Sequence, residues 1–349
     1  MKRDKKKNNK LEYSCNKVIL HGQKCSNILK VYNKEILYDE SLPISIELHL
    51  TNKCNLNCRW CVDKEIRRDR AEIKYEVLLK FLDDIKDKGV GLTIEGGGEP
   101  TVYPFFNEFI IEAGKRNIEL GLITNGVKRI NPELIKYFKW IRVSLDSSNR
   151  EEYKIEKGLD CFDKVMCNIK FLCESKKDTL IGVSYVLTES NYKNIIPLLK
   201  ELGIIGVDNV QIRAVEECNK YKINEEIMNK VKEDINKNLV SQNMYINLNT
   251  TVNSCRTDNN KLPCIAHSLR SIIHADGDVY LCEKRRHDII IIGNIIKDSF
   301  IDIWNSEKHK EASQKLMDFK NQNGCYVCRI TKFNEMFIDL CNTKTRNFI

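Results

Sequence analysis

The feature that most constrains the fold of this chain is an alternation, between residues 43 and 215, of short β-rich runs with longer amphipathic segments. Between the runs, apolar residues recur at helical spacing, which predicts helices long enough to carry the chain back across a sheet. Strands joined by such crossovers lie parallel to one another. The alternation therefore predicts an α/β fold, a partial (β/α)6 barrel that is shorter than the eight-unit TIM barrel. Its six strands are Ile44 to Leu50, Gly91 to Glu95, Glu119 to Thr124, Trp140 to Leu145, Leu180 to Leu187 and Asn209 to Val215.

The alternation ends after Val215, and we expect the sheet to end there too. A helical pattern from about Ile223 to Leu239 follows, and beyond Leu248 the spacing is irregular and several cysteines and histidines occur. The chain is therefore expected to consist of a basic tail and N-terminal extension (1–43), a (β/α)6 core (44–222), and a linker helix with a small cysteine-containing domain (223–349).

The charge distribution argues against a nucleic-acid-binding protein. The net charge of +8 comes from 57 Lys and Arg against 49 Asp and Glu, and six of the positive charges lie in the first ten residues. The remainder is close to balanced, without the basic surface that nucleic acids require. The N-terminus lacks the apolar region of a signal peptide, and the apolar stretch at 289–296 is too short to span a bilayer. We expect a cytoplasmic protein without nucleic-acid or membrane partners.

The fifteen cysteines of the chain need an explanation, because clustered cysteines in a reducing compartment indicate metal binding or catalysis more than disulfides. The tightest group, Cys54-Asn-Leu-Asn-Cys58-Arg-Trp-Cys61, directly follows the first predicted strand. Three thiolates leave one iron of a four-iron cluster open to a small ligand, whereas electron-transfer clusters are closed by four cysteines. The alternative is a zinc loop, but no Cys or His follows closely, so its fourth ligand would have to be His21 or Cys25 upstream.

This cysteine loop, placed after the first strand of a (β/α)6 pattern, resembles the radical S-adenosylmethionine (SAM) superfamily. The resemblance implies that Cys54, Cys58 and Cys61 bind a [4Fe–4S] cluster whose open iron chelates S-adenosylmethionine. Reductive cleavage then gives a 5′-deoxyadenosyl radical that abstracts a hydrogen atom from the substrate. It also implies an electron donor such as flavodoxin or ferredoxin. Trp60 occupies the aromatic position that packs near the adenine in the family; without the resemblance it would be assigned to the core.

Further positions match the family at the ends of the predicted strands, where ligands of parallel sheets bind. Gly97-Gly98-Glu99-Pro100 resembles the glycine-rich motif that meets the amino group of the cofactor, and glycines allow a backbone to approach a ligand closely. A plain turn is the alternative. Three polar residues are weaker candidates for binding the ribose hydroxyls of the cofactor: Asn125 at the end of the third strand, and Ser144 and Asp146 at the end of the fourth. For Ser144 and Asp146 the alternative is a role as a helix N-cap.

A second set of cysteines lies near the C-terminal end of the chain: Cys264, Cys282, Cys325 and Cys328. Their spacing, with Gly277 between the first two, resembles the auxiliary-cluster extension called twitch, a shortened SPASM domain. The resemblance implies a second, closed [4Fe–4S] cluster, and Asp276-Gly277 supplies the turn of a hairpin. Four thiolates would also suit zinc, and composition does not separate the two metals.

This second set departs from the full SPASM pattern. Asn334 and Ile338 stand where further cysteines of that pattern would follow Cys328, so a third cluster lacks ligands. Cys341 has no place in this pattern. Three roles remain open for it: a buried residue, a hydrogen-atom donor, or a neighbour of the auxiliary cluster.

The leading functional hypothesis is a dehydrogenase. Oxidation of a substrate radical needs an electron acceptor, which a closed cluster can supply, and twitch-containing relatives include dehydrogenases of cyclitols. We therefore expect oxidation of a small carbohydrate- or cyclitol-like molecule. The rivals are a peptide-modifying maturase that forms a cross-link or epimerises a residue, a redox-neutral isomerase, and a noncatalytic regulatory protein. A maturase is disfavoured here because only 53 residues precede Cys54, which is short for a leader-binding domain.

Two residues at the end of the sixth strand are the candidates for substrate chemistry. Arg213 lies on the strand and Glu216 just beyond it, and strand alternation places Arg213 with Gln211 on the more polar face. For Arg213, binding of the cofactor carboxylate, contact with the substrate and a structural ion pair all remain open.

Overall fold

The computed structural model describes residues 14–215, 221, 223–238, 244–249, 263–283, 291–318 and 330–344. The predicted basic tail lies outside the described residues. The chain forms two compact units. Of the described residues, the first unit contains 48–75 and 92–249, and the second contains 14–47, 76–91 and those from 263 onward.

The first unit is built on parallel strands in chain order, as the alternation predicts. From β2 to β7 each strand pairs in parallel with the next, and Val143 lies beside Val183 in the register of β4 and β5. All six expected strands are present, so the predicted α/β fold is confirmed. The strands in chain order are β1 (Ser45–Leu48), of which residues 45–47 belong to the second unit, β2 (Gly91–Ile94), β3 (Leu120–Thr124), β4 (Phe138–Ser144), β5 (Leu180–Leu187), β6 (Asn209–Ala214) and β7 (Tyr245–Asn249).

The expectation that the sheet ends at Val215 is wrong. Strand β7 extends it beyond β6, with Asn209 beside Tyr245 and Arg213 beside Asn249 in parallel register. The sequence of β7, Tyr-Ile-Asn-Leu-Asn, contains two asparagines, which are depleted in strands. Pairing with β6 outweighs that weak local preference.

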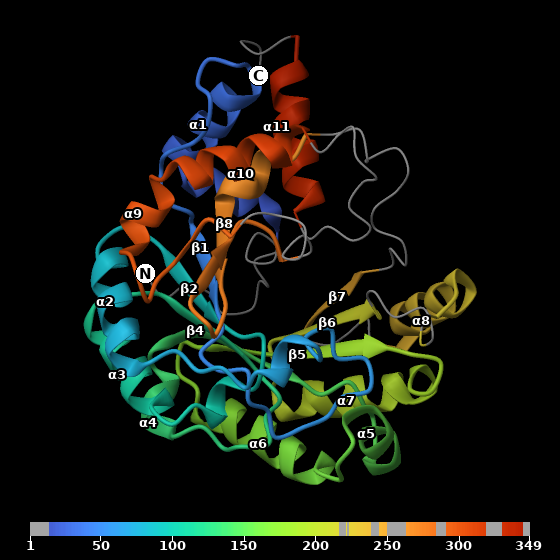
Figure 1. The fold of residues 1–349 in the computed structure, drawn as a ribbon. Coiled ribbons are helices and arrows are strands. Elements are labelled where there is room, and N and C mark those ends of the chain that lie inside the picture. The colour runs from blue at the N-terminus through green and yellow to red at the C-terminus, as the bar shows by residue number, and fades with distance from the viewer. Residues whose placement is uncertain are drawn as a thin grey trace, which may run out of the picture. The chain divides into compact units, whose positions relative to one another are not determined.

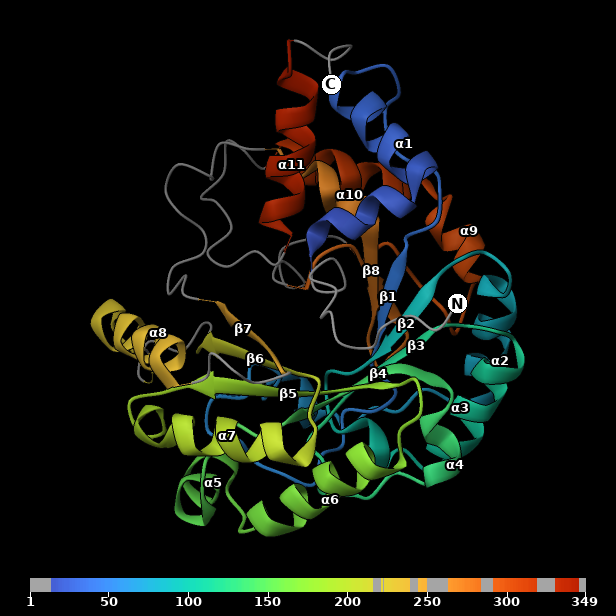
Figure 2. The ribbon, with the colours of Figure 1, turned by 180° about the vertical axis from the view of Figure 1, so that it is seen from behind.

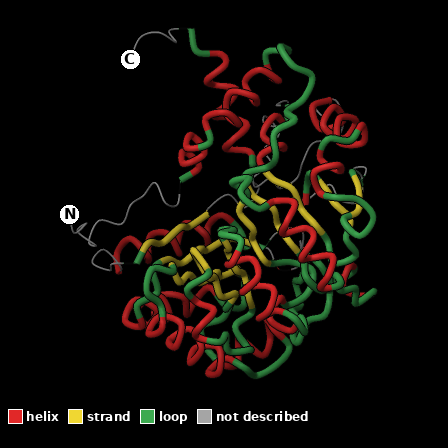
Figure 3. Tube along the Cα trace, turned by 90° about the vertical axis from the view of Figure 1, so that its left-hand side faces the viewer, coloured by secondary structure: helices red, strands yellow, loops and turns green. Residues whose placement is uncertain are grey.

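Helices of the first unit connect its strands. Figures 1 and 2 show α6 and α7 along one face of β4 to β6, and Figure 3 shows the same helical layer from the side. Apolar side chains between these layers are fully buried, among them Ile141, Val183 and Leu199. The helices are α3 (Phe106–Lys115), α4 (Pro132–Ile135), α5 (Arg150–Lys157), α6 (Phe162–Ser175), α7 (Ile195–Ile205) and α8 (Glu225–Asn238).

Helix α5 matters most for the site, and its ends are set by local chemistry. Asn149 caps the N-terminus by accepting a hydrogen bond from the backbone of Glu152 at 2.9 Å. Gly158 ends the helix in the left-handed conformation, with φ at +80°, which favours glycine. The helix is therefore limited to residues 150–157.

The second unit combines the strand order β10-β9-β8-β1 with helices. Its β8–β9 hairpin turns at Asp276-Gly277, with φ at +86° at the glycine, as the sequence predicts. Residues near both ends of the described chain share one apolar cluster, including Val18, Ile28 and Phe337. The elements are α1 (Gly22–Tyr32), α2 (Tyr75–Ile85), β8 (Arg270–Ile273), β9 (Asp278–Tyr280), β10 (Gly293–Asn294), α9 (Phe300–Trp304), α10 (Glu307–Asp318) and α11 (Thr331–Asn342).

A search of the described residues finds no helix with the length and apolar character needed to cross a membrane.

Candidate functional site

The three cysteines of the first group lie on the loop after β1, which we call the cysteine loop (residues 54–61). Their thiols are partly buried. The backbone N–H of Leu56 donates to Cys54 Sγ at 3.5 Å, and that of Cys61 donates to the carbonyl of Cys58 at 3.3 Å. Burial raises the pKa of Cys58 to about 11, against the opposing effect of the Lys157 ammonium. Burial and the Lys157 ammonium therefore act in opposite directions on the thiol of Cys58.

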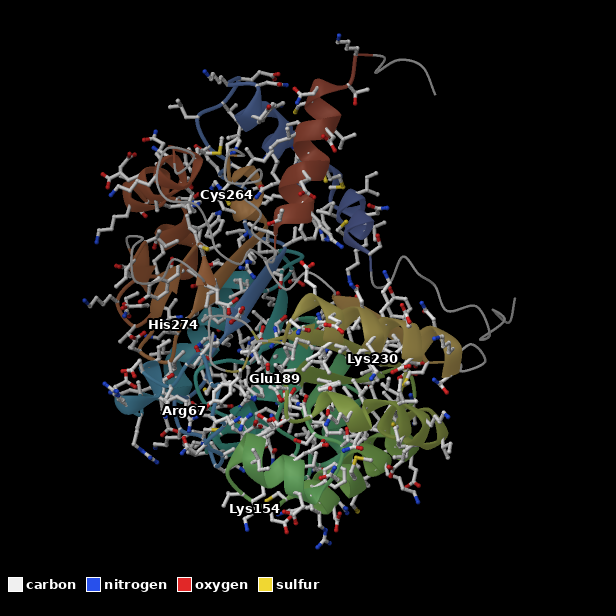
Figure 4. The ribbon with its side chains drawn as sticks, turned by 90° about the vertical axis from the view of Figure 1, so that its right-hand side faces the viewer. Arg67, Lys154, Glu189, Lys230, Cys264 and His274 are labelled. Carbon is white, nitrogen blue, oxygen red and sulfur yellow. The ribbon has the colours of Figure 1, made fainter. Side chains whose placement is uncertain are left out.

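A guanidinium group accompanies the three thiols. Arg67, labelled in Figure 4, donates from Nη2 to the carbonyl of Leu56 at 2.8 Å and from Nη1 to Cys61 Sγ at 3.7 Å. Burial alone would lower the pKa of Arg67, but the neighbouring thiols of Cys54, Cys61 and Cys58 raise it on balance. Arg67 therefore supplies a positive charge that contacts the thiol of Cys61 directly.

The cysteine loop has the donor set of a three-thiolate iron–sulfur site. Within the parts of the chain that the structure describes, no group of three or more His, Cys, Asp or Glu side chains is arranged so as to hold a metal ion. The match between this loop and an iron–sulfur cluster therefore depends on the chemistry of its donor atoms. Three partly buried sulfur atoms lie on one loop, and the Arg67 guanidinium contacts one of them. Net charge and hydrogen bonds to sulfur are the properties by which a protein tunes such a cluster.

The glycine-rich turn after β2 packs against the segment that leads into the cysteine loop. Gly96 and Gly97 have φ at +72° and +52°. A Cβ added to Gly98 would overlap the carbonyl of Lys53, so only glycine permits this approach. The backbone N–H of Gly98 donates to Thr51 at 2.9 Å. The structure thus brings the predicted Gly97 and Gly98 against residues 51–53, which lead into the cysteine loop.

Glu99 and Asn125 connect this turn to β3. The Glu99 carboxylate is 3% exposed and accepts from the hydroxyls of Thr101 and Thr124, each at 2.6 Å, and from the backbone N–H of Asn125 at 2.7 Å. Asn125 donates its amide to Asn55 Oδ1 of the cysteine loop at 2.6 Å. The sequence analysis missed Asn55, because an asparagine between two cysteines carries no signal of its own.

The residues after β4 have a structural environment that the sequence did not indicate. Asp146 has φ at +57° and is 1% exposed; its carboxylate pairs with Lys157 and accepts from the backbone N–H of Val186 at 2.7 Å. The hydroxyl of Ser144 accepts from Ser184 at 3.2 Å. Neither residue caps α5, because Asn149 does, so the capping alternative is wrong. Their contact with the ribose stays a prediction.

Trp60 is anchored by the last turn of α5. Its indole Nε1 donates to Glu156 Oε2 at 2.8 Å, and the Lys157 ammonium lies 5.1 Å from the centre of its ring. The sequence analysis missed Glu156 and Lys157, since Arg-Glu-Glu-Tyr-Lys-Ile-Glu-Lys reads as an exposed, charged helix. No pattern in the sequence distinguishes these two buried charges from their exposed neighbours.

Arg213 lies on β6, next to Val186 of β5 in the register. Gln211 and Arg213 are partly exposed and Ile212 is buried, which agrees with the predicted alternation. Glu216 lies outside the described residues, so the pair is not tested.

Two of the four auxiliary cysteines are described, and both belong to the second unit. Cys264, labelled in Figure 4, precedes the short helix Ile265–Leu269, and Cys282 follows β9. Asn334 donates from Nδ2 to Cys264 Sγ at 3.9 Å, while its Oδ1 accepts from the backbone N–H of Ala266 at 2.8 Å. An amide therefore contacts this thiol. Cys341 is buried on α11, and Cys325 and Cys328 lie outside the described residues.

Family models match two separate parts of the chain. Residues 48–202 match the radical SAM superfamily, and residues 264–329 match an iron–sulfur cluster-binding domain, SPASM. The second match includes the four auxiliary cysteines.

Individual relatives match over most of the chain. The cofactor-modifying protein of the tungsten-containing aldehyde ferredoxin oxidoreductase of Pyrococcus furiosus is 26% identical, over 75% of this chain and 81% of its own. The mycofactocin maturase MftC of Mycolicibacterium smegmatis is 24% identical, over 82% of this chain and 75% of its own. The crystal structure of Streptococcus suis SuiB bound to its precursor peptide SuiA superposes with a TM-score of 0.65 and 20% identity, over 93% of this chain and 78% of that one. At this identity the structural likeness establishes the fold alone.

Proposed function

Because this chain is a radical SAM superfamily enzyme with a SPASM iron–sulfur cluster-binding domain, we propose that it is a maturase that modifies a peptide. The observation that carries this proposal is the match to the maturase MftC, which extends over 82% of the chain and so takes in both domains. The SuiB fold, solved with a precursor peptide, is an example of this architecture accepting a peptide.

The expected oxidation of a small carbohydrate-like molecule is less well supported. The two relatives compared here are named a maturase and a cofactor-modifying protein, and neither name denotes a dehydrogenase of a small alcohol. A small-molecule substrate is accordingly the weaker proposal, and oxidation, cross-linking and epimerisation are outcomes that an experiment separates.

We assign the cofactors to the two sets of cysteines. Cys54, Cys58 and Cys61 would hold a [4Fe–4S] cluster, and Cys264, Cys282, Cys325 and Cys328 a second one. When bound, the first cluster and S-adenosylmethionine supply a 5′-deoxyadenosyl radical that abstracts a hydrogen atom from the substrate. An electron donor such as flavodoxin or ferredoxin belongs to the same proposal.

The residues of the first unit would orient S-adenosylmethionine. Gly97 and Gly98 let the backbone approach a ligand, and Glu99 fixes the end of β3 beside them. Trp60, Asn125, Ser144 and Asp146 complete the proposed cofactor site. Arg213 and Glu216 are proposed to face the substrate at the end of β6.

The test begins with the reconstituted, anaerobic enzyme. Reduction with S-adenosylmethionine should release 5′-deoxyadenosine, and no release would overturn the radical SAM activity. Coexpression with short peptides encoded beside the gene should then yield a modified peptide. Loss of two hydrogen atoms indicates a cross-link or another oxidation. A peptide whose mass is unchanged in ordinary water, but which takes up deuterium when the reaction is run in heavy water, indicates epimerisation. Turnover of cyclitols without any peptide product would restore the small-molecule hypothesis.

A further inference from the structure

The carboxylate of Glu156 is buried in the first unit and accepts hydrogen bonds from two segments of the chain, the cysteine loop and residues 188–190. The side chain of Glu156 is fully buried. Oε2 accepts from Trp60 Nε1 at 2.8 Å and lies 3.1 Å from Arg59 Nε. Oε1 accepts from the hydroxyls of Thr188 at 3.0 Å and Ser190 at 2.6 Å. In Figure 4, Lys154 marks α5 and Glu189 marks the loop between those two hydroxyls.

The backbone of the same turn holds the backbone of the cysteine loop. The carbonyl of Lys157 accepts from the N–H of Asn57 at 3.2 Å, and the carbonyl of Glu156 accepts from the N–H of Arg59 at 3.2 Å. These hydrogen bonds lie on either side of Cys58. The last turn of α5 therefore contacts the loop through two backbone carbonyls and one carboxylate.

A carboxylate suits this position better than any neutral side chain. An ionised carboxylate only accepts hydrogen bonds. Here Oε1 accepts two, and Oε2 accepts one and forms an ion pair with the Arg59 guanidinium. An amide of the same size would direct its own N–H groups toward donors at one of the two positions. It would also leave the Arg59 guanidinium without its anionic partner. The same guanidinium lies over the ring of Tyr221, with its central carbon 4.3 Å from the ring centre.

We propose that Glu156 is a positioning residue for the cofactor, which it orients through Trp60 and Arg59 of the cysteine loop. This inference rests on the proposed function, in which Trp60 contacts S-adenosylmethionine. The carboxylate fixes the rotation of the indole ring and the path of the loop between Cys58 and Cys61. Its loss allows the ring to turn, so that cofactor affinity falls although all three cysteines remain.

The test measures S-adenosylmethionine binding by the reconstituted full-length protein. Glu156→Gln should raise the dissociation constant about tenfold, the usual scale for a lost hydrogen bond to a charged group. It should also reduce the change that S-adenosylmethionine causes in the electron paramagnetic resonance spectrum of the reduced protein. Iron content should stay at the level of the parent.

Glu152→Gln is the matched control. Glu152 lies one turn earlier on α5, is 6% exposed, and accepts from the backbone N–H of Ser148 and from Asn194, each at 2.7 Å. Both variants remove one buried charge from the same helix, but Glu152 has no hydrogen bond with the cysteine loop among the described contacts. The control should bind S-adenosylmethionine within about twofold of the parent, although its stability falls by a similar amount.

Equal affinities of the two variants would overturn the inference. If Glu156→Gln does not fold or loses iron, Trp60→Phe replaces it, because phenylalanine keeps an aromatic ring without the indole N–H. This variant should also weaken binding, and an unchanged dissociation constant would overturn the inference. Failure of the parent protein to bind S-adenosylmethionine would instead show that the proposed function is wrong, and the inference with it.

Discussion

Asn125 at the end of β3 donates its backbone N–H to the buried carboxylate of Glu99, at 2.7 Å. The two residues are 26 positions apart, and the bond ties the glycine-rich turn after β2 to the next strand end. Asn125 also reaches the cysteine loop through Asn55, at 2.6 Å. One chain of hydrogen bonds therefore connects three loops at the ends of β1, β2 and β3.

Replacing Glu99 with glutamine should destabilise the protein. The carboxylate accepts from Thr101, Thr124 and Asn125, and an amide nitrogen would face one of these donors. The expected loss is about 1–3 kcal/mol of unfolding free energy. Urea denaturation followed by circular dichroism measures it. An unchanged midpoint of the urea transition would mean that the Glu99 carboxylate does not contribute to the stability of the protein.

Gly98→Ala should be strongly destabilising, because the added Cβ would overlap the backbone of Lys53. Relief requires the two loops to move apart, at a cost of at least about 2 kcal/mol. Gly22→Ala is the matched control, since a Cβ there meets nothing within 4 Å. Thermal unfolding should separate the two variants by several degrees, and similar melting temperatures would contradict the packing described for the turn.

Cys58→Ala should abolish cleavage of S-adenosylmethionine and leave the auxiliary cluster in place. An open-iron cluster needs all three thiolates of the cysteine loop, whereas the auxiliary cysteines belong to another segment. Iron content should fall from about eight to about four atoms per chain. Chromatography of 5′-deoxyadenosine gives the activity. Release at the rate of the parent would refute the assignment of this loop.

Replacing both Cys282 and Cys325 with alanine should separate radical formation from product formation. Cleavage of S-adenosylmethionine should continue, and deuterium from the substrate should still enter 5′-deoxyadenosine, because abstraction precedes any electron removal. Oxidised product should be absent. Circular dichroism is the control, since loss of cluster ligands can unfold a small domain. A folded variant with normal turnover would assign the auxiliary cysteines a structural role and favour epimerisation.

Stability should decrease as the solution becomes acidic, partly through His309. Burial lowers the pKa of His309 to about 4, although its hydrogen bond with the carbonyl of Trp304 opposes the shift. The unfolded chain, with a histidine pKa near 6.5, binds the proton more readily. The contribution is therefore complete above about pH 6.5 and is lost as the pH falls toward about 4, to a total of roughly 3 kcal/mol. His309→Gln should flatten this part of the stability profile in urea titrations at several pH values.

Features that depend on local spacing could be predicted from the sequence. The alternation of apolar runs located all six expected strands, and the positive φ at Gly97 and Gly277 agrees with the turns expected there. The cysteine spacings drew attention to two segments of the chain, which lie in the parts that match the radical SAM superfamily and the SPASM domain. These patterns repeat within a few residues, so they are visible without knowledge of distant contacts.

The burial of particular charged and polar residues, and the partners they meet, could not be predicted from the sequence and depend on the folded chain. Trp60 and Glu156 are 96 positions apart, and Asn334 contacts Cys264 across 70 positions. Strand β7 likewise exists through its pairing with β6, since its own sequence favours a strand only weakly. Burial of a charge is favourable only where partners from elsewhere in the chain converge on it. That convergence is set by the packing of the sheet and its helices, and no local pattern in the sequence encodes it.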